Sequence, residues 1–487
     1  MQSPIRTRRW LLALALVFTS ACLGAPSKSE PASDGSVDEV DAAALAPIKC
    51  ENAGNCPDAS GCQCGHCVVT DLACPVGSLR YALEDGTGAC VPTPTQTSVG
   101  YAHACVRWSD GHASCWGLDC HGQLGDQPTD VECDPDQLIR PVPVPVTWTR
   151  DGAPMDDVRQ ITTGFLHTCV RRGDDTVWCW GNGEVGQLGG GEFTGVGLEP
   201  VQVRTEDQEI LHATTITAGG FFTCALDQNG AAYCWGNNDF GQLGTSTFSG
   251  PSDRRPAAVP VTSDETFQKI AAGGAHTCAT HETGLDESTY CWGRNNLGQI
   301  GHNDQAATVE PEEQKVLRDD NDLPLVPTAA LGLGNYFSCA ATGFPDRLWC
   351  WGENRHHALG DVPQPVGDDG TTAYTAREVA YEPNGGVDSL SAGDDFACVL
   401  LGTGVVVCWG GNDFGQVGSG SAVAFEAPTE ILADVAALDL GFHSACAVTK
   451  EGEVLCWGEG AKGQLGNGSL ANLPVPTAVE GLCAIVD

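Results

Sequence analysis

Residues 164–169 read Gly-Phe-Leu-His-Thr-Cys, residues 179–182 read Cys-Trp-Gly-Asn, and residues 186–189 read Gly-Gln-Leu-Gly. This stretch decides the fold, because its central Cys-Trp-Gly returns seven times in the 487 residues. The seven copies begin at Cys115, Cys179, Cys234, Cys291, Cys350, Cys408 and Cys456. Six intervals separate the first copy from the last, so one repeat averages about 57 residues. A fixed internal period of this kind indicates units that stack on their neighbours.

Two glycines frame each copy. A closing glycine stands 10 residues after each of these cysteines, at Gly125, Gly189, Gly244, Gly301, Gly360, Gly418 and Gly466. An opening glycine precedes the cysteine by 15 residues in five copies and by 18 or 16 in the others, at Gly100, Gly164, Gly219, Gly273, Gly334, Gly393 and Gly441. Because the length varies mainly between repeats, the pattern indicates a rigid sheet with adjustable loops on one side.

Each repeat holds two cysteines around a short turn. Pairing Cys169 with Cys179 places Gly173, Asp174 and Asp175 at the tip of a β-hairpin, where such residues tolerate the positive φ that tight turns need. Opposed residues of antiparallel strands have Cα atoms about 4.5–5.5 Å apart, which a disulfide accepts. We predict seven disulfides: Cys105–Cys115, Cys169–Cys179, Cys224–Cys234, Cys278–Cys291, Cys339–Cys350, Cys398–Cys408 and Cys446–Cys456.

The N-terminus is typical of an exported protein. Three arginines within residues 6–9 precede the apolar run 10–18, which is too short to span a bilayer. The 25 cysteines of the chain also favour an oxidising compartment. The arginines are partly similar to a twin-arginine signal. We favour the general secretory route, because a disulfide-rich chain should fold only after export.

The signal ends in a motif that resembles a bacterial lipobox. Residues 19–22 read Thr-Ser-Ala-Cys, and in that motif the cysteine, here Cys22, is lipidated after cleavage. Thr19 departs from the Leu that the motif usually has. Leu23 and Gly24 lack the Asp of an inner-membrane retention signal. We therefore expect an outer-membrane or cell-surface lipoprotein, with a periplasmic or secreted protein as the alternative.

The quoted run, with its Gly-Phe-Leu-His-Thr-Cys, Cys-Trp-Gly-Asn and Gly-Gln-Leu-Gly, resembles a repeat of the regulator-of-chromosome-condensation family. The match recurs seven times from Gly100 to about Asp487. It implies an all-β fold, a seven-bladed β-propeller of four-stranded blades around a central channel. A secreted inhibitor of β-lactamases is in the same superfamily. We divide the chain into a signal peptide with its lipobox-like cysteine (1–22), a flexible tether (23–49), a small Cys-rich module (50–91) and the propeller (92–487).

The end of the chain suggests how the ring closes. Leu482–Val486 reads as the opening strand of a further repeat, and we predict that it completes the first blade. Cys120 and Cys133 are expected to form a local disulfide. We also predict a disulfide between Cys483 and one cysteine of the segment 50–90. The seven motif tryptophans are predicted to pack between blades with their indole N–H groups satisfied: Trp116, Trp180, Trp235, Trp292, Trp351, Trp409 and Trp457.

Several groups invite a chemical role. Cys62, Cys64, His66 and Cys67 could bind zinc in a reducing compartment, but in an exported chain they favour a disulfide module. His103, His167 and His276 each stand three residues after an opening glycine. The same position holds Phe222, Phe337 and Phe396 in other repeats, so we interpret it as a space-filling position.

Acids at turns, such as Asp174, Asp175, Asp394 and Asp395, match no EF-hand loop, and we interpret them as solvated. No Walker loop, nucleophile elbow or His-Glu-x-x-His motif is found in the sequence. We expect no catalytic residue, no cofactor and no metal.

The charge restricts the partners. The chain has 24 Lys and Arg against 63 Asp and Glu, a net charge of −39, which repels phosphate backbones and anionic headgroups. We expect a non-enzymatic, monomeric envelope module that engages an unknown protein through inter-blade loops, binds no nucleic acid and meets the membrane only through its lipid. The longest insert, about Asp126–Gln160, is the first candidate surface. Alternatives are an envelope enzyme acting on glycans and a secreted-type enzyme inhibitor. Nucleotide exchange on a GTPase, or chromatin binding, is the least favoured.

Overall fold

The chain divides into two units, residues 1–44 and 45–487, and every residue described below belongs to the second. The signal, the tether, Cys22, Cys133, Cys483 and the side chains of the Cys-rich module therefore lie outside the description. The computed structural model describes residues 61–63, 66–68, 78–82, 88–126, 138–149, 152–282, 287–318, 323–326, 328–343, 346–360, 372–421 and 423–482.

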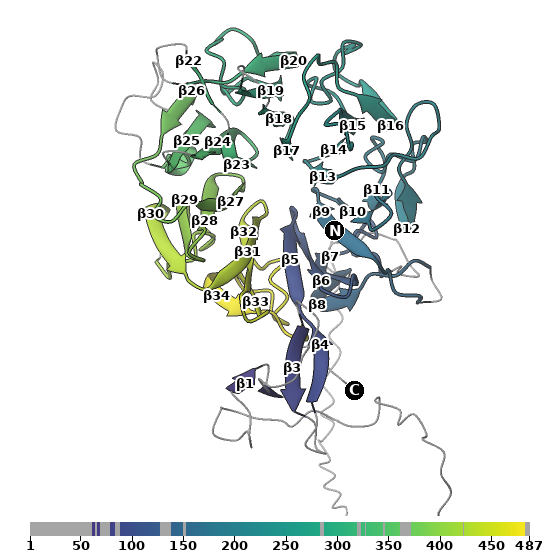
Figure 1. Ribbon diagram of the computed structural model, residues 1–487, viewed down its shortest axis with the longest axis vertical. Helices are drawn as coiled ribbons and strands as arrows, with labels where there is room; N and C mark the ends of the chain where they lie inside the picture. Colours follow the sequence, from purple (N-terminus) through teal and green to yellow (C-terminus); the bar gives the residue numbers. More distant parts are fainter. Residues whose placement is uncertain are drawn as a thin grey trace, which may run out of the picture. The chain divides into compact units, whose positions relative to one another are not determined.

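Seven sheets of four antiparallel strands follow one another along the chain and form the blades of a β-propeller (Figure 1). Blade 1 holds β5 (Pro94–Val99), β6 (His103–Trp108), β7 (Ala113–Leu118) and β8 (Ile139–Pro145). Blade 2 holds β9 (Val158–Thr163), β10 (His167–Arg172), β11 (Val177–Asn182) and β12 (Val196–Gln202). Blade 3 holds β13 (Thr215–Ala218), β14 (Phe222–Leu226), β15 (Ala232–Asn237) and β16 (Arg254–Pro260). Blade 4 holds β17 (Lys269–Ala272), β18 (His276–His281), β19 (Ser288–Arg294) and β20 (Val309–Lys315).

The remaining blades repeat this order. Blade 5 holds β23 (Thr328–Leu333), β24 (Phe337–Gly343), β25 (Asp346–Glu353) and β26 (Thr372–Glu378), and its sheet is extended by β21 (Leu317–Arg318) and β22 (Leu323–Pro324). Blade 6 holds β27 (Val387–Ala392), β28 (Phe396–Leu401), β29 (Val406–Gly411) and β30 (Phe425–Leu432). Blade 7 holds β31 (Val435–Leu440), β32 (Ser444–Thr449), β33 (Val454–Gly458) and β34 (Leu473–Ala478). One 3₁₀ turn, η4 (Arg355–His357), follows β25. The predicted seven-bladed, four-stranded propeller is confirmed.

A separate sheet precedes the propeller in the sequence. It consists of β1 (Gly61–Gln63), β2 (His66–Val68), β3 (Ser78–Ala82) and β4 (Gly88–Pro92), paired in that order. Within the described part of the chain there is no helix with the length and apolar character needed to span a membrane.

The predicted hairpin register is the observed one. In blade 2, Cys169 is opposite Cys179 and Arg171 is opposite Val177. The turn between them contains Asp175 at φ 63°. The seven predicted cysteine pairs are bonded in the structure, with Cα–Cα distances of 4.0–4.2 Å. Cys120 is also disulfide-bonded.

The tryptophans connect neighbouring blades. All seven motif indoles are buried, and each donates its N–H to a backbone carbonyl beside the closing glycine of the preceding blade, at 2.8–3.0 Å. Trp180 of blade 2, for example, donates to Gln123 of blade 1. Trp116 of blade 1 donates to Gln464 of blade 7, so the same contact closes the ring.

Residues 483–486 of the strand that we expect to complete blade 1 lie outside the described residues. The innermost strand of each blade directly precedes the opening glycine, and in blade 1 this place belongs to β5. Each blade therefore takes its four main strands from one continuous stretch of chain. Asp439 on β31 bonds across the seam, because its carboxylate accepts from Val99 N–H of blade 1 at 2.8 Å. The same carboxylate accepts from Ser391 Oγ of blade 6 at 2.9 Å.

Candidate functional site

The seven opening glycines surround a cavity of about 200 Å³ that is lined by residues of all seven blades. They pack backbone against backbone. A Cβ atom on Gly219 would stand 2.5 Å from the carbonyl oxygen of Gly273, and each of the other six would also come closer than 3.0 Å to the next glycine's carbonyl. Gly100 and Gly441 make this contact across the seam between blades 7 and 1. The channel wall at this level is therefore a closed ring that only glycine can build.

The residue after each opening glycine stands at the mouth of the channel, and here the repeats differ. In blades 7, 1 and 2 it is Phe442, Tyr101 and Phe165. Their ring centroids lie 5.0 Å apart for Tyr101 and Phe442, 5.6 Å for Tyr101 and Phe165, and 5.8 Å for Phe165 and Phe442. Phe221 of blade 3 joins Phe165 at 5.4 Å. These four residues form the aromatic side of the mouth, and Tyr101 is 44% exposed.

Blades 5 to 7 supply charged groups to the same end of the channel. In blade 6 the opening glycine is followed by Asp394 and Asp395, whose side chains are 17% and 13% exposed. Asp394 accepts a hydrogen bond from Asn335 of blade 5 at 2.8 Å and lies 3.6 Å from His443 of blade 7. Asp395 pairs with His356. The interpretation of these two acids as solvated turn residues is therefore wrong: both side chains are largely buried, and each contacts a histidine. We call Asp394, Asp395, His443 and Glu459 the acidic side.

His443 stands where the two sides meet. Its Nδ1 lies 3.2 Å from the Glu459 carboxylate, and its ring stacks on Phe414 at 4.5 Å and meets Phe442 edge-on at 4.5 Å. Burial alone would lower the pKa of His443, but its interactions with Asp394 and Glu459 outweigh burial and raise the pKa to about 9. His443 is therefore an imidazolium at neutral pH, and its charge is exceeded by the carboxylates around it.

The other predicted turn acids behave differently. Asp174 and Asp175, at the tip of the β10–β11 hairpin, have side chains 55% exposed. Thr176 donates hydrogen bonds to Asp174, and this lowers the pKa of that carboxyl. These two acids are solvated, as the sequence predicts.

The three repeated histidines are packing residues. His103, His167 and His276 are fully buried, and each Nε2 meets a hydroxyl of the next blade, as His103 meets Thr168 at 2.9 Å. Burial lowers the pKa of each to about 3, so they stay neutral. They occupy the position that Phe222 fills in blade 3, which agrees with the space-filling interpretation.

The mouth is arranged for binding. It offers one exposed and three partly buried aromatic rings beside a cluster in which carboxylates outnumber His443. Aromatic rings attract Lys and Arg side chains through cation–π contacts, and carboxylates attract them through ionic contacts. A glycosidase would need two carboxyl groups that converge on one bond. Asp394 and Asp395 are instead each paired with a histidine.

The sequence pattern did not single out His443, Glu459 or the aromatic side. The signal that could have found them is the one or two residues after each opening glycine. Across the seven repeats these positions read Tyr-Ala, Phe-Leu, Gly-Phe, Gly-Ala, Asn-Tyr, Asp-Asp and Phe-His, whereas the glycine itself never changes.

Two family models match the chain. Both describe the regulator of chromosome condensation (RCC1) repeat. One matches residues 174–226, 229–280 and 451–487, and the other matches 158–187, 213–242, 387–416 and 434–464.

Curated proteins are similar to this chain over part of its length. The mitochondrial RCC1 domain-containing protein RUG3 of Arabidopsis thaliana is 28% identical over 333 residues, which are 65% of this chain and 70% of that protein. The human E3 ubiquitin-protein ligase HERC2 is 28% identical over 273 residues, and the match covers 56% of this chain but only 5% of HERC2.

Solved structures agree on the fold. The structure of Prp20p from Saccharomyces cerevisiae superimposes with a TM-score of 0.62 at 20% identity and covers 80% of this chain and 88% of that one. Prp20p is described as binding Gsp1p and histones. At this level of identity the likeness shows the fold alone.

Proposed function

We propose that this chain, a propeller built from repeats of the regulator-of-chromosome-condensation type, is a non-enzymatic binding module of the bacterial cell envelope. It engages another protein at the channel mouth, through a basic segment that enters between the aromatic and acidic sides. The observation that carries this proposal is the contrast within each repeat: the glycine ring is constant, and the side chains next to it are not. Propellers and solenoids place binding residues on such variable positions.

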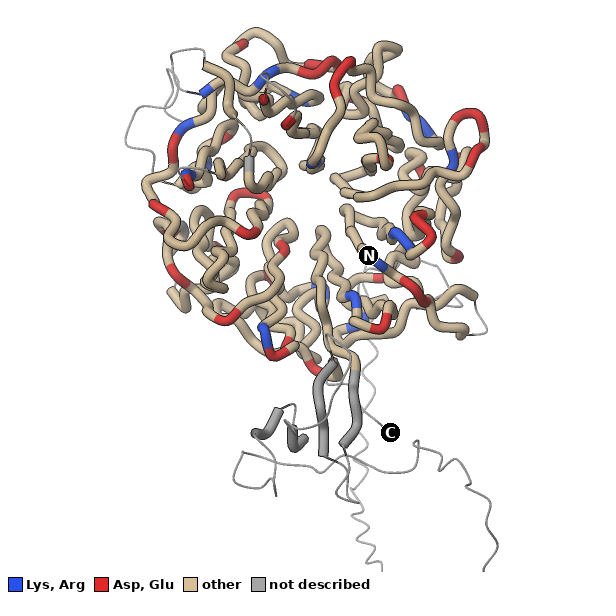
Figure 2. The backbone as a smooth tube through the Cα atoms, in the orientation of Figure 1, with Lys and Arg blue, Asp and Glu red and all other residues tan. Residues whose placement is uncertain are grey.

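Charge complementarity selects a basic partner. The net charge is −39, and Figure 2 shows acidic residues spread around the ring, with far fewer basic ones. The mouth adds aromatic surface, which supplies affinity that salt does not screen. The binding of Gsp1p and histones by Prp20p, which has the same fold, supports an interaction role for propellers of this type.

The test is capture with matched variants. The disulfide-bonded chain, immobilised without its signal, is exposed to envelope proteins of its own source at low and high salt. We expect one stoichiometric protein to be retained by the wild type and by a variant with Asp174→Asn and Asp175→Asn on the exposed hairpin. Tyr101→Ala and Asp394→Asn should each lose it. Loss in the hairpin variant with retention in both mouth variants would refute the mouth as the binding surface.

The envelope location is inferred from the N-terminal signal and Cys22, and from the disulfide-bonded cysteines of the blades. Lipidation at Cys22 is expected to hold the chain in the membrane fraction. Mass spectrometry of the mature N-terminus should show an acylated cysteine, and Cys22→Ser should release the protein into the soluble fraction. A wild-type chain that is soluble and unacylated would point to the secreted alternative, an inhibitor-type propeller.

A further inference from the structure

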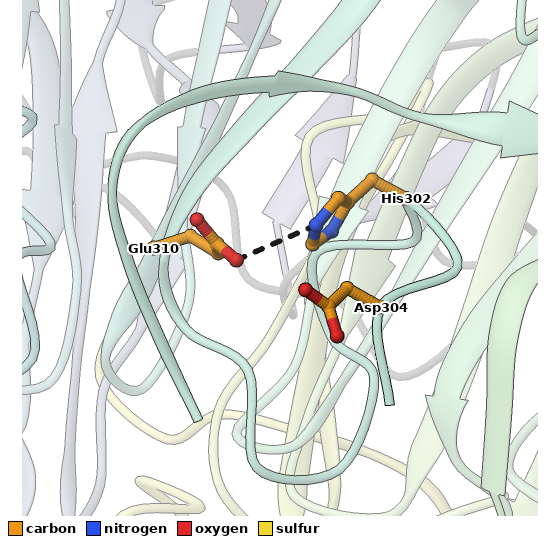
Figure 3. Close-up of side chains that lie close together, drawn as sticks. All are labelled: His302, Asp304 and Glu310. Atoms are coloured by element: carbon orange, nitrogen blue, oxygen red, sulfur yellow. Dashed lines mark ion pairs between the residues drawn. The ribbon is translucent and has the colours of Figure 1, made fainter. Parts of the chain in front are cut away.

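Blade 4 carries a cluster of potential metal ligands outside the channel mouth. His302 and Asp304 follow the closing glycine Gly301, and Glu310 lies at the start of β20. Ligand atoms of the three side chains all lie within 4.8 Å of one another. Figure 3 shows the imidazole and the two carboxylates turned toward a common space. His302 Nε2 is 3.4 Å from a Glu310 oxygen.

Backbone contacts hold His302 and Glu310 in place before any ion binds. His302 forms a β-bridge with Thr375 of blade 5, and Asn303 donates its N–H to Tyr374 at 2.9 Å. Glu310 is held in the sheet opposite Gly293. The spacing of His302 and Glu310 is therefore set by the backbone of two blades.

The side chains are arranged as ligands as well. Asp304 Oδ1 accepts the backbone N–H groups of Ala306 at 2.8 Å and Ala307 at 3.2 Å, which orients the carboxylate. The side chains of His302 and Glu310 are 16% and 17% exposed. His302 Nδ1 is buried and makes no hydrogen bond within the described residues. One imidazole nitrogen thus lacks a protein partner, and the other has only the Glu310 contact.

The positions of His302 and Glu310 can be compared between blades. We call them the two slots: the first is the residue after the closing glycine, and the second is the residue paired with the glycine of Cys-Trp-Gly. In blade 1 they hold Asp126 and Arg140, which pair at 3.0 Å. In blade 6 they hold Ser419 and Glu426, and the hydroxyl lies 3.0 Å from the carboxylate. A contact across the slots is thus an ordinary feature of the blade. Blade 4 differs because its slots hold an imidazole and a carboxylate, and because Asp304 adds a third donor.

We propose that His302, Asp304 and Glu310 bind a zinc ion, with water in the remaining position. Imidazole nitrogen and carboxylate oxygen are both zinc ligands, and three protein ligands leave the fourth tetrahedral position open to water. Calcium prefers six to eight oxygen ligands, and the cluster offers fewer. The exposed Asp304 gives the ion access from solvent.

The test uses the full disulfide-bonded chain, stripped with a chelator and titrated with zinc chloride by calorimetry. We expect His302→Ala to bind one equivalent fewer than the wild type, and Asp304→Asn and Glu310→Gln to bind that equivalent at least about tenfold more weakly. Glu426→Gln, which alters the matched slot of blade 6, should bind like the wild type. The thermal midpoint of each stripped variant, followed by circular dichroism, should stay near that of the stripped wild type.

A second readout locates the ion. Diffraction data collected on either side of the zinc absorption edge should show an anomalous peak between the three side chains, and His302→Ala crystals should lack it. Zinc stoichiometry that is equal in the wild type and in His302→Ala would overturn the proposal. So would tight calcium binding at these residues with no zinc bound.

Discussion

The glycine ring and the channel mouth are neighbours in every repeat, yet they behave in opposite ways. Each opening glycine contacts the next one around the channel, and no larger residue fits at this position because a Cβ atom would clash with the neighbouring carbonyl. The residue that follows varies among tyrosine, phenylalanine, glycine, asparagine and aspartate. The comparison shows that the repeats keep a constant structural frame, by which we mean the opening glycines, the blade disulfides and the motif tryptophans. Sequence differences between repeats occur one or two residues after the opening glycine. Substitutions in the frame should cost stability, and those at the mouth should cost binding.

Replacing a motif tryptophan should cause the largest loss of stability. Trp235→Ala removes a fully buried indole and its hydrogen bond to the Gln187 carbonyl. We expect the free energy of unfolding to fall by about 3–5 kcal/mol. Urea denaturation followed by circular dichroism measures the change. Trp148→Ala, at a half-buried indole outside the set of seven, should have a smaller effect. Equal losses in both variants would contradict the special place of the motif residue.

Removing one blade disulfide should have the next largest effect. Replacing Cys224 and Cys234 together by alanine frees a loop whose ends are 10 residues apart. The chain-entropy estimate gives a loss of about 2–3 kcal/mol. The comparison is made by denaturation without reductant. An unchanged unfolding midpoint would show that this pair contributes nothing.

The glycine ring should tolerate a methyl group poorly. Gly219→Ala would bring Cβ to 2.5 Å from the Gly273 carbonyl oxygen, and the blades would have to separate. A loss of about 1–3 kcal/mol is typical of such overpacking. The control is Gly195→Ala, whose Cβ would meet nothing within 4 Å. If the two variants unfold at the same urea concentration, the ring contact is not restrictive.

The mouth should show a pH dependence on the alkaline side of neutrality. Because the pKa of His443 is raised from 6.5 to about 9 on folding, its stabilising contribution is complete below pH 6.5 and is lost as the pH rises through 9. Thermal midpoints of the wild type and His443→Gln should therefore converge between pH 6.5 and about 9. Curves that stay parallel over this range would mean that the imidazolium is not stabilised by Asp394 and Glu459.

The smallest effect on stability is expected at the mouth itself. Tyr101→Ala removes a side chain that is 44% exposed and contacts its neighbours only through ring edges and faces. We expect less than about 1 kcal/mol of destabilisation, since exposed substitutions are usually mild. Partner capture should nevertheless be lost. If Tyr101→Ala unfolds easily and still binds the partner, Tyr101 contributes to stability and not to binding, which contradicts the prediction.

The sequence predicted the features that lie within one repeat. The hairpin register, the seven cysteine pairs and the position of each tryptophan follow from local spacing, because strands of one blade are adjacent in the chain. The packing of the tryptophans between blades was also predicted, but the other contacts between blades were not. His443 meets Asp394 only because two blades stand at a particular angle, and Asp439 bridges to Val99 only because the ring closes. The spacing of residues holds no information on those angles.

Seven contacts between seven glycines make a closed cycle, and a closed cycle imposes a condition that an open row of repeats does not. The rotations between successive blades must sum to one full turn, so a displacement at one joint has to be compensated at the other six. One blade cannot rotate without a change in the others, and small deviations in the angles between blades do not accumulate along the chain as they do in a solenoid. Tyr101 and His443, which stand on blades 1 and 7, are thereby held in register although they belong to opposite ends of the propeller sequence. A binding surface assembled from both ends is already in place before a partner arrives, and little ordering remains to oppose association.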